Sequence, residues 1–286
     1  MSIVAYPPPA RPVIDPVQLD RAYRTARNDL LARREVSGHW VGHLCSSALA
    51  TATAASALSI YARHTDEVAR GQAATELARR AVDGLVGQQQ EDGGWGDTDR
   101  SVSNIATTML ARAAIRLATP GDEPLPDHHA HAVHRADEYV ERQGGIPALR
   151  ERYGRDKTFA VPILTNAALA GQVAWEQVPP LPFEAGALPL AWLRVARLPV
   201  VSYAIPALVA IGQARYFHHR PRNPLTWTVR RAAVRPGMRR LGRMQPASGG
   251  YLEAVPLTAF VVMSLAATGR VGHPVARRGV KFLFDT

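Results

Sequence analysis

A short pattern that recurs along the chain constrains its fold more than any other feature. In this pattern a leucine precedes a glutamine by four positions, and the glutamine precedes a Gly-x-aromatic triplet by four. One copy runs from Leu85 to Trp95 and a second from Leu241 to Tyr251. A weaker copy ends at Trp40, and a partial one ends at Gly145. Such repetition indicates a fold assembled from similar units.

Each copy places a helix end directly before a tight turn. The defining residues are Gln89, Gly93 and Trp95 in one copy, Gln245, Gly249 and Tyr251 in another, and Glu35, Gly38 and Trp40 in the weaker copy. The weaker copy has glutamate in place of glutamine and one residue fewer before the glycine. A glutamine at a helix end can bond backbone groups that a glycine turn leaves free, while the aromatic ring folds back. We expect each copy to join two helices, and the set to tie an α/α-barrel together along its outside.

The remaining sequence predicts helix almost throughout, and therefore an all-α fold. Apolar residues recur at helical spacing, and no stretch shows the sustained alternation of a strand. The expected helices are 20–34, 45–62, 67–90, 103–117 and 131–143, with uncharged windows at 198–214 and 254–269 read as buried helices. Prolines between 179 and 199 mark an extended connector anchored by Trp175, Phe183 and Trp192. We expect an extended proline-rich segment over 1–19 and a single α/α-barrel domain over 20–286.

The charge balance is strongly basic but does not indicate a nucleic-acid partner. The chain has 34 Lys and Arg against 24 Asp and Glu, a net charge of +10, and only Lys157 and Lys281 are lysines. An excess carried by arginine favours a coding bias over a dedicated binding surface. The arginine-rich segment 215–243 lacks the interleaved aromatic residues on which nucleotide bases stack. The single cysteine, Cys45, excludes an intrachain disulfide and fits the reducing cytoplasm.

Residues 198–222 are candidates for contact with a membrane. An uncharged aliphatic run leads directly into a cluster of arginines and histidines, a pairing typical of interfacial segments. The alternative is that Pro199 and Pro206 shape a buried helix. The candidate contact residues are Leu198, Val200, Val201, Arg215, Arg220 and Arg222. On this reading the protein is cytoplasmic, with peripheral attachment at the inner face of the cell membrane.

These segments together resemble the squalene–hopene cyclase family of class II terpene cyclases, whose QW motifs share the leucine, glutamine, glycine and tryptophan. The resemblance covers about residues 20 to 286, through Gly38-His39-Trp40 and residues 90–96, 175–184 and 249–258. Residues 278–283 resemble the start of a further motif whose glutamine would follow Thr286. The chain therefore resembles the amino-terminal, γ-type part of a cyclase with two α-barrel domains.

The resemblance implies cyclisation of a polyprenyl substrate such as squalene, begun by the central aspartic acid of an Asp-x-Asp-Asp motif. The sequence contains no such motif. Its nearest match is Asp97-Thr98-Asp99-Arg100, where the arginine favours ionised carboxylates, and we interpret it as a turn with an N-cap. We expect no catalytic residue in this chain, and no activity without an acid-bearing β-domain protein or a missing carboxyl-terminal half. The alternative is a non-catalytic isoprenoid- or lipid-binding module.

No cofactor or metal site is expected from the sequence. His39, His43 and Cys45 lack the spacing of a zinc site and are interpreted as structural residues. The histidines at 128, 129, 131 and 134 are interpreted as a solvated cluster near a helix start. Neither a phosphate-binding G-x-x-x-x-G-K-[ST] loop nor a G-x-S-x-G nucleophile turn occurs.

Overall fold

The computed structural model describes residues 15–41, 45–119, 123–153, 157–187 and 205–286. The chain divides into two units, Met1–Cys45 and Ser46–Thr286. In the smaller unit, helix α1 spans Pro16–Ala32, and the Asp15 carboxylate caps it by accepting a hydrogen bond from the Val17 N–H. Residues 16–19, which the sequence predicts to be extended, are therefore helical. The division falls after Cys45, whereas the sequence placed it after residue 19.

The larger unit consists of helices joined by turns and by some longer connecting segments. Its helices are α2 (Ala48–His64), α3 (Val68–Gly87), α4 (Ile105–Ala118), α5 (Asp127–Arg142), α6 (Gly145–Tyr153), α7 (Lys157–Leu169), α9 (Ile205–His218), α10 (Pro224–Met244), α11 (Val255–Ala266) and α12 (Pro274–Asp285). In the part of this unit that the structure describes, the 3₁₀ turns are η1 (Trp175–Gln177), η2 (Phe183–Ala187) and η4 (Tyr251–Glu253). Within the described residues no strand forms beyond one isolated bridge between Trp95 and Asn104. The all-α prediction is confirmed.

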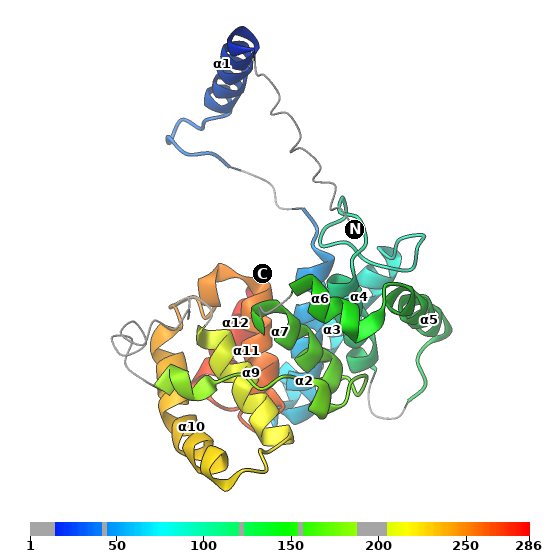
Figure 1. Cartoon of the computed structure of the whole chain (residues 1–286), viewed down its shortest axis with the longest axis vertical. Helices are drawn as coiled ribbons and strands as arrows, with labels where there is room; N and C mark the ends of the chain where they lie inside the picture. Colours follow the sequence, from blue (N-terminus) through cyan, green and yellow to red (C-terminus); the bar gives the residue numbers. More distant parts are fainter. Residues whose placement is uncertain (1–14, 42–44, 120–122, 154–156, 188–204) are drawn as a thin grey trace, which may run out of the picture. The chain divides into compact units, whose positions relative to one another are not determined.

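The larger unit has an inner ring of helices with further helices packed outside it. Around the ring α2 contacts α4, α4 contacts α7, α7 contacts α9, α9 contacts α11, and α11 returns to α2. Outside the ring α3 packs on α2 and α4, α5 on α4, α10 on α9, and α12 on α11. Figure 1 shows α5 and α10 on opposite sides of this unit. The arrangement is the α/α-barrel that the sequence predicts.

Composition explains which helices lie inside. The inner helices α2, α4 and α11 are buried around most of their circumference, and they consist largely of apolar and small residues. On α2, for example, Ala52, Ala55 and Ala57 are completely buried. Small side chains let neighbouring helices approach closely without leaving voids. The outer helices α3, α5 and α12 bury one face each, because charged residues cover the other face.

The segment between α7 and α9 is anchored by aromatic rings, in part as the sequence predicts. Phe183 in η2 is fully buried, and a Cβ on Gly212 of α9 would lie only 2.7 Å from the Phe183 Cβ. A glycine at position 212 therefore lets η2 pack directly against α9. The Trp175 ring stacks on the His218 ring, with centroids 4.6 Å apart. Trp192 lies outside the described residues.

The sequence placed several helices correctly but misplaced their ends and missed others. Asn104 caps α4 by accepting from the Thr107 N–H at 3.0 Å. In contrast, α2 begins after Ser47 and not at Cys45, and α5 begins at Asp127 and not at His131. Helices α6, α7 and α10 were not expected, since α7 and α10 each carry an interior proline that reads as a break.

We expect the N-cap of α12 to make stability depend on pH. The His273 Nδ1 accepts a hydrogen bond from the Val275 N–H at 3.2 Å, so the ring must be unprotonated at that nitrogen. Burial, with help from Arg270 and Arg278, lowers the pKa of His273. A folded-state pKa below the unfolded value gives a contribution to stability that is complete above about pH 6.5 and is lost as the pH falls.

The variant His273→Asn keeps a capping acceptor at every pH. We therefore expect wild type to lose up to about 1 kcal/mol relative to this variant between neutral and mildly acidic pH. Urea unfolding followed by circular dichroism at several pH values measures the difference. Parallel pH profiles for the two proteins would contradict the expectation.

Candidate functional site: three repeated helix–turn units

The first complete unit, Leu85–Trp95, folds back on the helix that precedes it. The Trp95 indole Nε1 donates to the Leu85 carbonyl, ten residues earlier, at 2.8 Å. The ring is only 1% exposed. Between these residues the chain reverses at Gly93, whose φ of +87° lies in the region that favours glycine. The unit therefore closes the end of α3 and directs the chain toward α4.

The Gln89 amide of this unit links the turn to the next outer helix. Its Nε2 donates to the Gly93 carbonyl at 2.9 Å and to the Ala132 carbonyl of α5 at 2.8 Å. The two glycines of the turn lie against the same helix. A Cβ on Gly93 would lie 2.6 Å from the Arg135 carbonyl oxygen, and one on Gly94 would lie 2.9 Å from the Tyr139 ring. Turn and helix therefore fit only because both residues lack a side chain.

The second complete unit, Leu241–Tyr251, repeats this geometry at the end of α10. The Gln245 Nε2 donates to the Gly249 carbonyl at 2.9 Å and to the Val275 carbonyl of α12 at 3.0 Å. The Tyr251 hydroxyl donates to the Leu241 carbonyl at 2.8 Å, again ten residues earlier. Burial raises the pKa of that hydroxyl, so it stays a donor. The phenol thus performs the hydrogen bonding of the indole in the other unit.

A threonine on each following inner helix completes the unit, and sequence reasoning missed both. The Trp95 backbone N–H donates to Thr108 Oγ1 at 3.0 Å, and the Tyr251 N–H donates to Thr258 Oγ1 at 2.9 Å. Both threonines are fully buried, and each is the fourth residue of its helix. The sequence signal that could have identified them is a threonine at the fourth position of the helix that follows each turn. Each unit therefore joins three helices, namely the preceding outer, the following inner and the following outer helix.

The weaker copy, in the smaller unit, has the same turn but a different register from the one expected. The Trp40 Nε1 donates to the Leu30 carbonyl at 2.6 Å, ten residues earlier. Gly38 has a φ of +91°, and its carbonyl accepts from the Arg34 Nε at 2.9 Å. Arg34, and not Glu35, therefore holds the position of the glutamine. Counted from Leu30 through Arg34 and Gly38 to Trp40, this copy has the same spacing as the complete units and lacks no residue. The arginine side chain reaches the glycine carbonyl that glutamine reaches in those units.

The partial copy over 143–145 continues directly into a helix. Gly144 and Gly145 have φ values of +90° and +63°, and α6 begins at Gly145. The turn glycine is therefore shared with the complete units, while the chain path after it is different.

The Asp97–Arg100 segment is a turn that supports the start of α4. The Asp97 carboxylate accepts hydrogen bonds from the Asn104 amide and the Thr107 hydroxyl. The Asp99 backbone N–H donates to the Ser46 carbonyl at 3.2 Å. These contacts are structural ones, as the sequence interpretation expects of a turn.

The basic segment proposed as a membrane contact is only partly at the surface. Arg215 is 9% exposed, and it donates to the carbonyls of Val178 and His219. Its guanidinium therefore satisfies buried carbonyl groups and cannot face lipid headgroups, which corrects the expectation. Arg220 and Arg222 are exposed. Leu198, Val200 and Val201 lie outside the described residues.

The described helices include none that could cross a bilayer, because none is both long enough and apolar enough. This agrees with the sequence interpretation of the uncharged windows, since the second of them forms the buried helix α11.

Fold and turns define a class of protein: an α/α-barrel whose helices are linked by repeated glutamine–glycine–aromatic turns. The chain belongs to the squalene-hopene cyclase N-terminal domain family, which matches residues 23–227. It is also 28% identical over 195 residues to enfumafungin synthase of Hormonema carpetanum. That similarity covers 67% of this chain and 12% of the relative, so the chain spans a small part of the length of the relative.

Proposed function

We propose that this chain is the amino-terminal, γ-type portion of a squalene–hopene-like class II terpene cyclase. The observation that carries the proposal is the family match over residues 23–227. The two complete turn units support it, and we propose that they and the Leu30–Trp40 unit are QW motifs. In this role the barrel forms one wall of the space that encloses a polyprenyl substrate such as squalene, and the turns keep that wall rigid.

We further propose that the chain does not cyclise substrate by itself. Protonation of an isoprenoid double bond requires a carboxylic acid that stays protonated. The printed sequence contains no Asp-x-Asp-Asp motif, and the Asp97 carboxylate of its nearest match is engaged by Asn104 and Thr107. The acid must then come from a β-domain protein or from a carboxyl-terminal half.

Incubation with squalene tests both statements. Three incubations are compared: the chain alone, an acid-bearing β-domain protein alone, and the two together. Products are separated by gas chromatography and identified by mass spectrometry. We expect cyclised product only when both proteins are present. Cyclised product from the chain alone would refute the proposal that the chain is inactive by itself. If the chain binds squalene but adds nothing to turnover, the alternative of a non-catalytic isoprenoid-binding module is favoured.

We also propose a peripheral membrane contact at Arg220 and Arg222, which follow α9 and are exposed. Each basic residue near an anionic lipid surface contributes about 1 kcal/mol. Reversing both charges is therefore expected to weaken binding to anionic vesicles by about tenfold or more. Vesicle sedimentation of the double variant Arg220→Glu with Arg222→Glu measures this effect.

A control makes the same change of charge elsewhere. Arg80 and Arg100 are also exposed, and the double variant Arg80→Glu with Arg100→Glu alters net charge equally. If both double variants bind vesicles alike, the attraction is a property of total charge and the assignment to Arg220 and Arg222 is wrong.

A further inference from the structure

One carboxylate and two imidazoles come together where α3 meets the start of α5. Asp83 lies in α3, and His128 and His129 lie in the first turn of α5. The ligand atoms that these three residues offer all lie within 4.8 Å of one another. No sequence pattern links them, because Asp83 and His129 are 46 positions apart.

The closest two atoms already have the spacing of metal ligands. The Asp83 Oδ1 and the His129 Nε2 are 3.1 Å apart. Two ligands at zinc-binding distances and tetrahedral angles are separated by about 3.3 Å. The exposed His128 ring lies beside that of His129, with centroids 4.2 Å apart. A ring nitrogen of His128 lies within 4.8 Å of the other two ligand atoms, so joint binding of one ion requires this exposed side chain to turn toward them.

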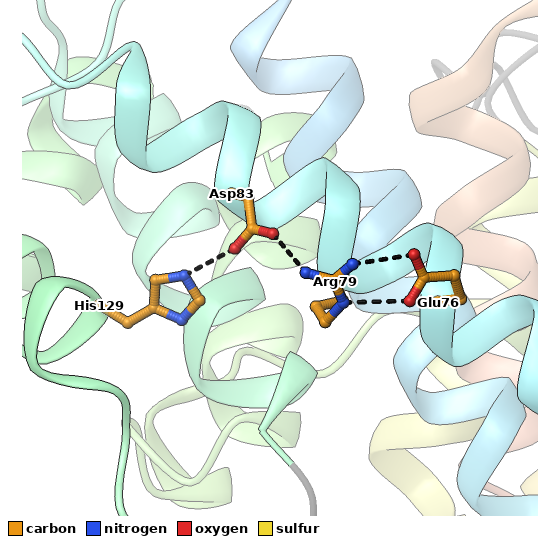
Figure 2. Close-up of polar contacts among 4 residues, drawn as sticks. All are labelled: Glu76, Arg79, Asp83 and His129. Atoms are coloured by element: carbon orange, nitrogen blue, oxygen red, sulfur yellow. Dashed lines mark hydrogen bonds and ion pairs between the residues drawn. The ribbon is translucent and has the colours of Figure 1, made fainter.

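The surrounding side chains hold Asp83 in position, as Figure 2 shows. The Arg79 Nη1 donates to the second carboxylate oxygen, Oδ2, at 2.8 Å. Arg79 is itself held by Glu76 through two hydrogen bonds of 3.0 and 2.9 Å. Partners of this kind orient a ligating carboxylate and leave its other oxygen for the ion. Glu76 and Arg79 balance each other in charge, so Asp83 supplies a net negative charge.

His129 is held equally firmly. Its side chain is buried, at 8% exposure, whereas His131 and His134 on the same helix are exposed. The His134 Nδ1 is 3.6 Å from the Glu138 Oε1, so this histidine has a different acidic neighbour from His129. The structure therefore separates the four histidines, and the solvated cluster expected from the sequence describes only part of the group.

We propose that Asp83, His128 and His129 bind one divalent transition-metal ion of the zinc class, with water at the fourth position. Imidazole nitrogens with one carboxylate suit zinc, cobalt, nickel or copper and not magnesium or calcium. The ion takes the place of the direct hydrogen bond between Asp83 and His129. Because the ligands come from two helices, the bound ion ties α3 to α5 and stabilises the folded chain.

Titration of the tag-free chain with cobalt(II) tests the proposal. We expect visible d–d absorption that saturates at one ion per chain and disappears when zinc is added. Zinc at about 100 times its dissociation constant is expected to raise the melting temperature by about 5 °C or more. Absence of both effects would overturn the proposal.

Matched variants identify the ligands. His128→Ala removes an exposed ligand without opening the core, and Asp83→Asn preserves the shape of the side chain, so both are expected to fold and to bind cobalt at least tenfold more weakly. His131→Ala removes an exposed histidine from the same helix and is expected to bind as wild type does. Unchanged binding by His128→Ala, or an equal loss in His131→Ala, would show that these three residues do not form the site.

Discussion

Replacing Gly249 with alanine is expected to lower the free energy of unfolding by about 3 kcal/mol or more. Two effects add at this position. Gly249 has a φ of +90°, which strains any residue with a Cβ. In addition, the new Cβ would lie 2.3 Å from the Arg278 carbonyl oxygen, so the turn must move away from α12. That movement also breaks the bridge from Gln245 to Val275. Urea unfolding followed by circular dichroism measures the loss.

Gly269→Ala is the matched control for this experiment. Gly269 also has a positive φ, of +72°, but a Cβ there meets no atom within 4 Å. Its substitution therefore carries the backbone strain alone, about 1 kcal/mol. Equal losses in the two variants would mean that the close approach of the turn to α12 adds nothing to stability.

Truncation of Trp95 to alanine is expected to cost about 3 to 5 kcal/mol. The ring is among the largest fully buried side chains of the described residues. Its loss leaves a cavity and also removes one of two hydrogen bonds that the buried Leu85 carbonyl accepts, the other coming from the Gln88 N–H at 2.9 Å. Thermal and urea unfolding of the variant measure the effect.

Two further variants separate the causes. Trp95→Phe keeps most of the ring volume but removes the donor, so its cost is expected to be about 1 to 3 kcal/mol. Trp227→Ala removes a partly exposed tryptophan that lies under the Arg231 guanidinium, 5.0 Å from the ring centroid, and is expected to cost about 1 kcal/mol or less. A loss for Trp95→Ala no larger than for Trp227→Ala would contradict the structural role of the turn.

The turns themselves were largely predictable because their interactions are local. The glycine with positive φ and the ring that folds back on its own helix involve residues within about one dozen positions of one another, as for Trp95 and Leu85. Even so, register was misjudged at Arg34. The sequence favoured the acidic residue as a substitute for glutamine, whereas the longer arginine side chain reaches the Gly38 carbonyl. The spacing from Trp40 identifies the residue that replaces glutamine, whereas the chemical similarity of glutamate to glutamine does not.

By itself, then, the sequence determined the helical class and the α/α-barrel, because repeated local patterns and the absence of strand alternation leave few other folds. The family followed from the resemblance of particular motifs. Only the tertiary structure decided which distant groups meet. The Arg215 guanidinium donates to the Val178 carbonyl, and the Gln89 amide donates to the Ala132 carbonyl. The Asp83 carboxylate lies within hydrogen-bond distance of the His129 ring. The physical reason is that such pairs depend on how helices pack, and side-chain packing across the barrel is set by the shapes of many residues together.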